Sequence, residues 1–308
     1  MRAQERADAA LAVPARPEGA GVLAPARALV ATFKFRIAFA IGLSALGGAV
    51  LAGGGWPAPW QAVVLLGSVL LASFGAAGCN HYLERALDRR MRRTRNRPFA
   101  SGRLSGSPGW PVLFGAMIAA GSALALVQLG IASGLFVLAG ALTYVVVYTA
   151  WLKPASDWNI VIGGAAGSFG VLAGAAAAGE FMQTPVLWLA LVLLLWTPSH
   201  FWALAIALVD DYRRAGLPML PVTRGVQAAA RWTMINSLLL AGATLALGWT
   251  LASPLYWLLA GTGVFWLLVT NFDLLRDPGP RAAMTAFFAS LIQLGLLLAG
   301  LFVNAAVG

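Results

Sequence analysis

A short polar segment, NHYLERALDRRMRRTRNRP at residues 80–98, directly follows the apolar run WQAVVLLGSVLLASFGAAGC. Within it Asn80, Glu84 and Asp88 are spaced four residues apart, so on a helix they share one face. Carboxylate and amide oxygens are the ligands that Mg²⁺ prefers, usually together with water and phosphate oxygens. Acidic side chains at the edge of so apolar a run are costly and usually functional. The three residues therefore predict a magnesium site.

Seven arginines occupy the same segment. Arginine forks match phosphate oxygens, and acids beside arginines are typical of a site for Mg²⁺ and pyrophosphate. We expect Arg85, Arg93 and Arg97 to bind the diphosphate. Any single arginine at such a helix end is more often a charge that sets the orientation of a membrane helix, which is the alternative for each of them.

A second acidic segment, VDDYRRAG, ends a later apolar run. We expect its Asp210 and Asp211 to complete the site, with Asp211 as a further metal ligand and Arg214 as a diphosphate contact. An acidic pair before arginines is also typical of a solvated helix end, but the symmetry with the first segment favours function. Lys153 is predicted to be another diphosphate contact, the alternative being a lysine that anchors its helix end at the interface.

His200 stands inside another apolar run, in WTPSHFWALA. Such a histidine is a satisfied core residue, a contact to a bound group, or a proton acceptor. Asp211 follows 11 residues later, close to three helical turns, so we expect both side chains to face one cavity. The other histidine, His81, is expected at the membrane interface, on a different helix face from Asn80.

The composition indicates which elements hold these side chains. Of 308 residues, 60% are hydrophobic and only 10% are charged, whereas a soluble domain has about 25% charged residues. Apolar runs of about 20 residues without period-2 alternation predict membrane-spanning helices and not barrel strands. We predict an all-α polytopic membrane protein with nine transmembrane helices, near residues 35–53, 60–83, 109–129, 131–152, 159–179, 186–209, 228–251, 254–272 and 283–305.

The basic residues predict the orientation of this chain. The 21 Lys and Arg gather in the N-terminal tail, at the start of the first helix, and around the connections after the second, fourth, sixth and eighth helices. The positive-inside rule then puts the N-terminus in the cytoplasm and the C-terminus outside. The net charge of +10 fits this orientation and anionic lipid headgroups, so we expect the lipid bilayer as a partner and no nucleic acid.

The predicted domain organisation is simple. Residues 1–30 are rich in Ala, Pro and Arg and predict a disordered cytoplasmic tail, which one transmembrane domain at 31–308 follows. The two acidic segments lie four helices apart on the same side of the membrane. Their spacing predicts two four-helix halves plus a ninth helix around a central cavity.

The chain resembles the UbiA-type intramembrane prenyltransferases. Their pattern is Asn-x-x-x-Asp-x-x-x-Asp after the second helix and a second Asp-rich motif after the sixth; here Glu84 takes the middle place of the first motif. Within that superfamily the chain is most similar to the haem O synthases. The matching strings are RRTRNRP, YTAWLK, NIVIGGAAG, WTPSHFWALA and DYRRAGLPMLPV, within roughly residues 30–305.

The resemblance implies Mg²⁺-dependent transfer of a farnesyl group from farnesyl diphosphate to the 2-vinyl group of haem B. Water adds in the same reaction, which gives haem O and pyrophosphate, so haem B is a substrate and Mg²⁺ the cofactor. We expect an acceptor site at His200, Tyr148 and Trp196. The residues expected to take part in catalysis are Asn80, Glu84, Asp88, Asp210, Asp211 and His200. The expected location is the inner membrane of a bacterium, with haem A synthase as a candidate partner.

The chain departs from the haem O synthase pattern at the helices expected to hold the acceptor. Ser199 replaces a proline, SFGVLAG stands where Pro-Pro is usual, and KFR at 34–36 replaces Lys-Pro-Arg. A sister prenyltransferase with a quinone-precursor or chlorophyll-type acceptor is one alternative, which DYRRAGLPMLPV disfavours. A secondary transporter or a haem-binding assembly factor is the other, which the arginines clustered beside the acids disfavour.

Overall fold

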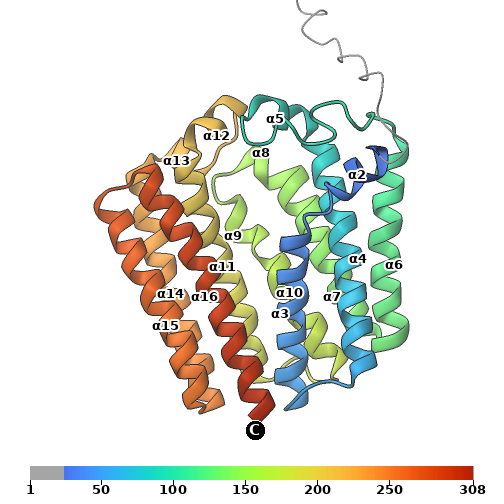
Figure 1. Cartoon of the computed structure of the whole chain (residues 1–308), viewed down its shortest axis with the longest axis vertical. Coiled ribbons are helices and arrows are strands. Elements are labelled where there is room, and N and C mark those ends of the chain that lie inside the picture. Colours follow the sequence, from blue (N-terminus) through green and yellow to red (C-terminus); the bar gives the residue numbers. More distant parts are fainter. Residues whose placement is uncertain (1–23, 308) are drawn as a thin grey trace, which may run out of the picture.

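The computed structural model describes residues 24–307, and within them every regular element is a helix (Figure 1). Nine of these helices are long and apolar enough to cross a membrane. They are α3 (Phe35–Gly53), α4 (Pro59–Leu83), α6 (Gly109–Leu129), α7 (Ile131–Leu142) continued by η1 (Thr143–Leu152) and α8 (Lys153–Ala155), α9 (Asn159–Gly163) with α10 (Ala165–Ala177), α11 (Thr184–Ala207), α14 (Val226–Leu251), α15 (Pro254–Arg276) and α16 (Pro280–Val307). The short elements are α2 (Ala24–Val30), α5 (Arg85–Arg90), α12 (Val209–Ala215) and α13 (Leu220–Thr223).

All nine predicted spans are confirmed, and only their ends differ. The largest difference is at α15, which was predicted to end at residue 272 and ends at Arg276. Its last turn, DLLR, is too polar for a hydropathy criterion but keeps its backbone hydrogen bonds as a helix.

The predicted tail at 1–30 needs a correction. Residues 1–23 lie outside the described part of the chain, but Ala24–Val30 form the helix α2. Ala28 is buried there, in an apolar cluster that also contains Cys79 of α4 and Phe114 of α6. This tertiary packing explains why a segment without a long apolar run is ordered.

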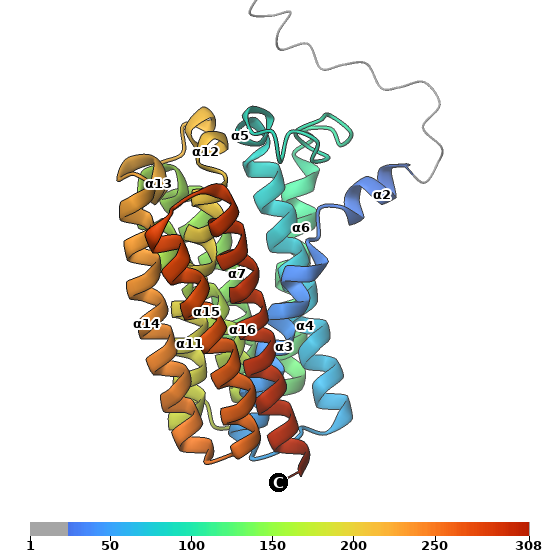
Figure 2. The same cartoon turned by 60° about the vertical axis from the view of Figure 1, so that its left-hand side comes forward.

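The helices lie side by side, with α5, α12 and α13 gathered at one end and the C-terminus at the other (Figures 1 and 2). The helices α3, α4, α6 and α7 pack on one another, and so do α11, α14, α15 and α16. The fifth span, through α10, packs against α3 and α7 as well as α11. The prediction was two four-helix halves plus a ninth helix, whereas here the fifth span lies between the first four spans and the last four, and α3 also contacts α11 and α16 directly. The two acidic segments meet at the end where α5 contacts α12.

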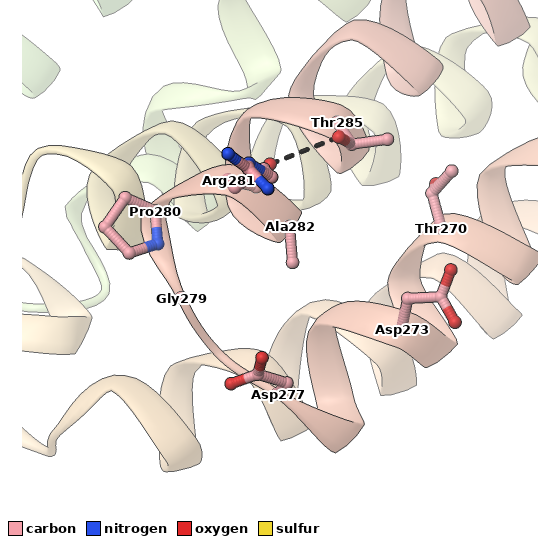
Figure 3. Close-up of a pocket in the computed structure, with 8 residues that line it drawn as sticks. All are labelled: Thr270, Asp273, Asp277, Gly279, Pro280, Arg281, Ala282 and Thr285. Atoms are coloured by element: carbon pink, nitrogen blue, oxygen red, sulfur yellow. Dashed lines mark hydrogen bonds between the residues drawn. The ribbon is translucent and has the colours of Figure 1, made fainter.

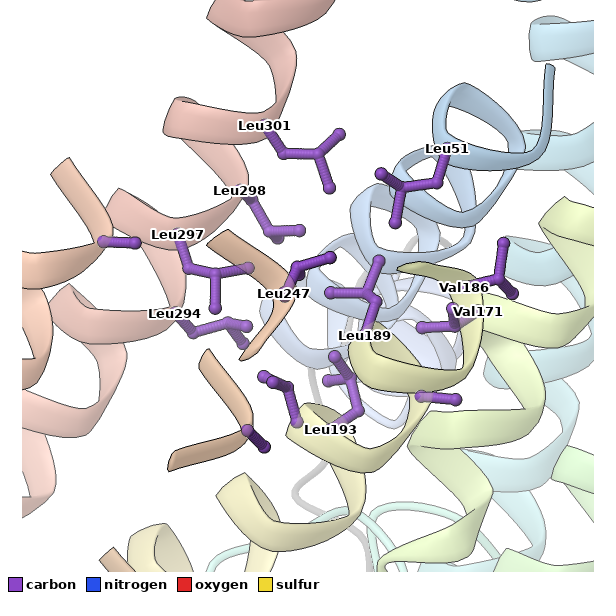
Figure 4. Packing of buried hydrophobic residues seen from close by; sticks show 14 of the residues in the cluster. Leu51, Val171, Val186, Leu189, Leu193, Leu247, Leu294, Leu297, Leu298 and Leu301 are labelled. Atoms are coloured by element: carbon purple, nitrogen blue, oxygen red, sulfur yellow. The ribbon is translucent and has the colours of Figure 1, made fainter. Parts of the chain in front are cut away.

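A large apolar core lies where the two groups of helices meet (Figure 4). It contains Leu51 of α3, Val171 of α10, Leu189 of α11, Leu247 of α14 and Leu297 of α16, of which all but Leu51 are completely buried. Since lipid is as apolar as these side chains, the contact depends on van der Waals packing and on how closely the backbones approach.

Two glycines permit the closest approach in the bundle. A Cβ on Gly174 of α10 would lie 1.7 Å from the carbonyl oxygen of Ala45 in α3, and a Cβ on Gly48 of α3 would lie 2.1 Å from that of Val171. Both distances are far inside van der Waals contact, so α3 and α10 fit together only with glycine at these positions. The Gly- and Ala-rich fifth span thus has a direct packing function.

We predict that Gly174→Ala destabilises the protein by about 1–3 kcal/mol or more, because α3 and α10 must separate to admit the methyl group. Gly242→Ala on α14 is the matched control, since a Cβ there meets nothing within 4 Å. The measurement is the midpoint of thermal unfolding of both variants purified in the same detergent. Equal midpoints for the two variants would contradict this account of the α3–α10 contact.

Candidate active site

The first acidic segment forms one nearly continuous helical path. The helix α4 ends at Leu83, Glu84 lies at the junction, and α5 begins at Arg85. The amide of Glu84 donates to the carbonyl of Asn80 over 2.9 Å, and that of Asp88 donates to Glu84 over 2.8 Å. Asn80, Glu84 and Asp88 therefore lie on one face of a helical path, as their spacing predicted. All three side chains are buried against the rest of the protein.

Each buried carboxylate has a cation beside it. The ammonium of Lys153 contacts Glu84 directly. Nη1 of Arg97 lies 2.9 and 3.0 Å from the two carboxylate oxygens of Asp88 and 4.0 Å from Glu84 Oε2. Two acids and two cations from three parts of the chain thus form one cluster, as the sequence predicted for these four residues.

Lys34 belongs to the same cluster, although no site role was predicted for it from KFR at 34–36. It precedes α3 in a left-handed backbone conformation, with φ at 48°. Its ammonium donates to Asn80 Oδ1 over 2.6 Å and to the hydroxyl of Tyr144 over 3.0 Å. The Asn80 amide nitrogen in turn donates to Thr149 over 3.1 Å. The only signal in the sequence was a basic residue next to the first span.

Burial and neighbouring charges shape the ionisation of this cluster. Burial and, after it, the nearby Arg97 lower the pKa of Lys34, Glu84 partly offsets them, and the pKa is about 7 as a result. Burial alone would raise the pKa of Glu84, but the adjacent Lys153 outweighs it and brings the pKa below its ordinary value. The carboxylate is therefore kept ionised, which is the form that binds a cation.

A π-helix positions the side chains on the opposite wall. The element η1 is wound with i→i+5 bonds, a geometry that occurs frequently at functional sites. The rings of Tyr144 and Tyr148 stack with centroids 5.8 Å apart, and the Lys153 ammonium lies 5.7 Å from the Tyr148 centroid. This winding was not predicted, because no residue pattern in TYVVVYTAWL distinguishes it from an α-helix.

The second acidic segment closes over the first. Asp211 of α12 accepts hydrogen bonds from the backbone amides of Arg92 and Arg93, over 3.4 and 3.2 Å, and pairs with Arg214. Burial would raise the pKa of Asp211, but the amides of Arg93 and Arg92, together with Arg214, bring it below its ordinary value. In this structure Asp211 ties α12 to the loop that follows α5.

The other predicted charges lie further out. Asp210 is 72% exposed and pairs with Arg213 over 2.6 Å, so it is not brought into the buried cluster. Arg85 donates to the carbonyl of Tyr82 over 2.7 Å and stacks on that ring. The side chain of Arg93 is exposed.

His200 and Trp196 form a separate group against α16. Their rings stack at 4.3 Å, and Phe287 stacks on the other side of His200, also at 4.3 Å. Ser290 donates its hydroxyl proton to the carbonyl of Phe287 over 2.6 Å. At 2.7 Å from the same hydroxyl oxygen, His200 Nδ1 must therefore be the donor, which leaves Nε2 as the acceptor atom.

Two expectations about the histidines are wrong. His200 and Asp211 do not lie three turns apart on one helix, because α11 ends at Ala207 and Asp211 belongs to a new helix that starts after Leu208. His81 is not interfacial: it is 4% exposed, and neither ring nitrogen has a hydrogen-bond partner among the described residues. Helix periodicity alone could not show that neighbouring helices cover this face of α4.

The oxygen ligands of the cluster fit Mg²⁺ only together with a diphosphate. Among residues 24–307, no three His, Cys, Asp or Glu side chains lie close enough together to hold a metal ion by themselves. Glu84 and Asp88 lie within reach of a single Arg97 nitrogen, so these two carboxylates are neighbours. Because Mg²⁺ is commonly held by one or two carboxylates together with substrate phosphates and water, this pair, with Asn80, fits the ion when a diphosphate supplies the remaining oxygens.

Comparison with known proteins decides the family. The sequence profile of the UbiA prenyltransferase family matches residues 41–305. The chain belongs to the UbiA prenyltransferase family. It is 46% identical over 280 residues to protoheme IX farnesyltransferase 2 of Paramagnetospirillum magneticum, an alignment covering 90% of this chain and 96% of that one. It is 34% identical over 287 residues to protoheme IX farnesyltransferase 1 of Cenarchaeum symbiosum, covering 91% and 96%.

Solved structures agree on the fold of this family member. A digeranylgeranylglyceryl phosphate synthase superposes with a TM-score of 0.75 at 16% identity, covering 92% of this chain and 99% of that one. A UbiA homologue from Archaeoglobus fulgidus, bound to GPP and Mg²⁺, gives 0.64 at 17% identity, covering 91% and 99%. The chain is therefore a multi-pass membrane prenyltransferase, and the transporter and assembly-factor alternatives are excluded.

We predict that Asp211→Ala loosens the loop after α5, because the amides of Arg92 and Arg93 lose their shared acceptor. The measurement is the rate at which trypsin cleaves the purified protein in this arginine-rich loop, and we expect a rise of about tenfold. Asp210→Ala is the matched control, since Asp210 contacts only the exposed Arg213 in the described structure. The same cleavage rate in both variants would contradict the proposed tie.

Proposed function

We propose that this family member transfers a farnesyl group from farnesyl diphosphate to the 2-vinyl group of haem B and adds water, giving haem O and pyrophosphate. The observation that supports binding and cleavage of the donor, farnesyl diphosphate, is one buried cluster of charges. It consists of Glu84, Asp88, Arg97, Lys153 and Lys34. The relatives named as protoheme IX farnesyltransferases support haem B as the acceptor, because the alignments cover most of both chains. They favour haem over a quinone-precursor or chlorophyll-type acceptor.

The cations of the cluster would receive the diphosphate. Arg97, Lys153 and Lys34 come from a loop, the end of the fourth span and the start of the first, so they surround the buried carboxylates from different directions. Three other arginines lie further from the buried carboxylates, at the side from which the diphosphate would enter: Arg93, Arg214 and Arg85. Positive charge held at the leaving group stabilises its developing negative charge during cleavage.

Asn80, Glu84 and Asp88 would hold Mg²⁺ together with diphosphate oxygens, and Asp211 would serve as a further ligand on binding. The ion supplies charge neutralisation of the pyrophosphate when bound. To bind it, Glu84 and Asp88 must exchange part of their present contacts with Lys153 and Arg97. Those cations are then free to contact the phosphates, so substrate and metal binding reinforce each other.

The reaction itself would proceed in an apolar space between the helices. The bond between C1 of the farnesyl group and the diphosphate oxygen breaks, and the terminal carbon of the 2-vinyl group forms a bond to C1. Water then adds to the cation on the carbon next to the porphyrin ring, and one proton is lost. Loss of the diphosphate leaves positive charge on C1 of the farnesyl group. The stacked rings of Tyr144 and Tyr148 beside Lys153 would exclude water from this allylic cation and face the acceptor.

His200 would act at the acceptor. Its Nδ1 is fixed by Ser290, and its ring is held between Trp196 and Phe287, so Nε2 is oriented as an acceptor. We assign Nε2 as the acceptor of the proton that the added water loses, with Trp196 presenting a flat apolar face to the porphyrin. The departure at Ser199 lies beside this group, where Ser199 accepts hydrogen bonds from Asn236 and Ser237 of α14.

The chain would work in the plasma membrane of a bacterium, with the N-terminus and the acidic segments on the cytoplasmic side and the C-terminus outside. The distribution of basic residues supports this orientation. Farnesyl diphosphate then reaches the cluster from the cytoplasm, while its apolar chain enters between the helices. A haem A synthase in the same membrane would be the natural recipient of the product.

We predict that Asp88→Ala and Asp211→Ala each lower haem O formation by at least about 10²-fold. The measurement is the product mass after incubation of purified protein with haem B, farnesyl diphosphate and Mg²⁺. Glu180→Ala is the matched control, because Glu180 is an exposed acid in the connection between α10 and α11. Normal haem O formation by either aspartate variant would refute the assignment of that residue, and prenylation of a different acceptor would refute the proposed substrate.

We predict that His200→Gln lowers turnover of haem B by about 10²-fold or more while leaving the affinity for farnesyl diphosphate unchanged, because the proton acceptor is lost and the donor site is not. Turnover is measured by product mass, and donor affinity with a non-reactive farnesyl thiolodiphosphate. Unchanged turnover would remove His200 from the mechanism, and weakened donor binding would place it at the donor site instead.

A further inference from the structure

A pocket of about 330 Å³ lies at one end of the hairpin formed by α15 and α16, outside the proposed active site. Its lining includes Thr270, Asp273 and Asp277 from α15 and the residues after it, and Arg281 and Thr285 from the first turns of α16 (Figure 3). No residue of the proposed donor or acceptor sites lines it. The pocket therefore needs an explanation of its own.

The charges in this pocket are not paired with one another. Asp277 donates its backbone amide to the carbonyl of Asp273 over 3.0 Å, which places the two carboxylates one turn apart at the helix end. Arg281 comes from the facing helix, whose Thr285 donates to the Arg281 carbonyl over 3.1 Å. Within residues 24–307, none of these three charged side chains takes part in an ion pair of 4.0 Å or less. The pocket thus has a negative side and a positive side.

The pocket lies at the level of lipid headgroups. It sits where two membrane-spanning helices end, since α15 ends at Arg276 and α16 begins at Pro280. Large apolar side chains beside it face outward: Phe272 is 48% exposed and Phe288 is 54% exposed. A lipid with its headgroup in the pocket would lay its acyl chains along these side chains.

The chemistry of the lining selects among possible occupants. Farnesyl diphosphate and haem propionates carry only negative charge and would be repelled by Asp273 and Asp277. A metal cation would be repelled by Arg281, and none of the eight lining residues is aromatic, as recognition of a quaternary ammonium would require. A primary ammonium can instead donate three hydrogen bonds to carboxylates and hydroxyls, while a neighbouring phosphate binds the guanidinium.

We propose that this pocket binds the headgroup of phosphatidylethanolamine, with the ammonium at Asp273 and Asp277 and the phosphate at Arg281. The occupant is a structural lipid that holds the α15–α16 hairpin at the membrane surface. The proposal depends only on the chain being a membrane protein and is independent of the reaction catalysed.

The test is native mass spectrometry of the purified, delipidated protein offered equal amounts of phosphatidylethanolamine, phosphatidylcholine and phosphatidylglycerol with identical acyl chains. Wild type should retain phosphatidylethanolamine about tenfold more than either competitor, because only that headgroup presents a primary ammonium and a phosphate together. The double variant Asp273→Asn with Asp277→Asn should lose this preference, and Arg281→Gln should weaken retention of all three lipids.

Glu180→Gln is the matched control, because it removes one exposed carboxylate in a different connection, and it should retain the wild-type preference. Both aspartates are exposed, so the double variant should keep the unfolding midpoint of the wild type. Equal retention of phosphatidylethanolamine and phosphatidylcholine by wild type would overturn the proposal. An unchanged preference in a folded double variant would overturn it equally, since the ammonium would then bind elsewhere.

Discussion

The pairing of buried carboxylates with buried cations is the interaction on which the rest of this structure depends. Glu84 and Asp88 are 5% and 2% exposed at the end of a membrane-spanning helix. Ionised side chains in such a place are stable only with partners, and loss of one partner from a buried pair typically costs about 3–5 kcal/mol. The partners are Arg97, nine residues after Asp88, and Lys153, 69 residues after Glu84, so the end of the fourth span must meet the end of the second. In the proposed function the same charges would also bind the metal and the diphosphate, because a group that needs a counter-ion in the resting protein can exchange it for a metal or a phosphate.

Close packing elsewhere holds those parts in place. The contact of α3 with α10 through Gly48 and Gly174 fixes the first span, and with it Lys34 at its start. The π-helical stretch η1 turns Tyr144, Tyr148 and Lys153 toward the cluster. Asp211 then links the far half of the bundle to the loop after α5. The candidate active site is thus a product of packing across the membrane domain and not of one motif.

The features predicted from the sequence were those with a local cause. The nine spans follow from runs of apolar residues, and the buried face of Asn80, Glu84 and Asp88 follows from helical spacing. Features caused by tertiary contacts were missed. Lys34 reaches Asn80 only because its own backbone is left-handed and α3 packs beside α4, which carries Asn80. The helix α2 is held by packing on α4 and α6. The prediction that His200 and Asp211 face one cavity was wrong because the helix breaks at Leu208, and no residue in VDDYRRAG marks that break.

The most direct test of the central claim is the affinity of the purified protein for farnesyl thiolodiphosphate, measured with Mg²⁺ and again with the ion removed by a chelator. If Glu84 and Asp88 exchange their cations for Mg²⁺ as the diphosphate binds, the ion should strengthen binding by about tenfold or more. Asp88→Asn should abolish that difference. Equal affinity with and without Mg²⁺ in the wild-type protein would contradict the account, because the buried carboxylates would then serve only to hold Lys153 and Arg97.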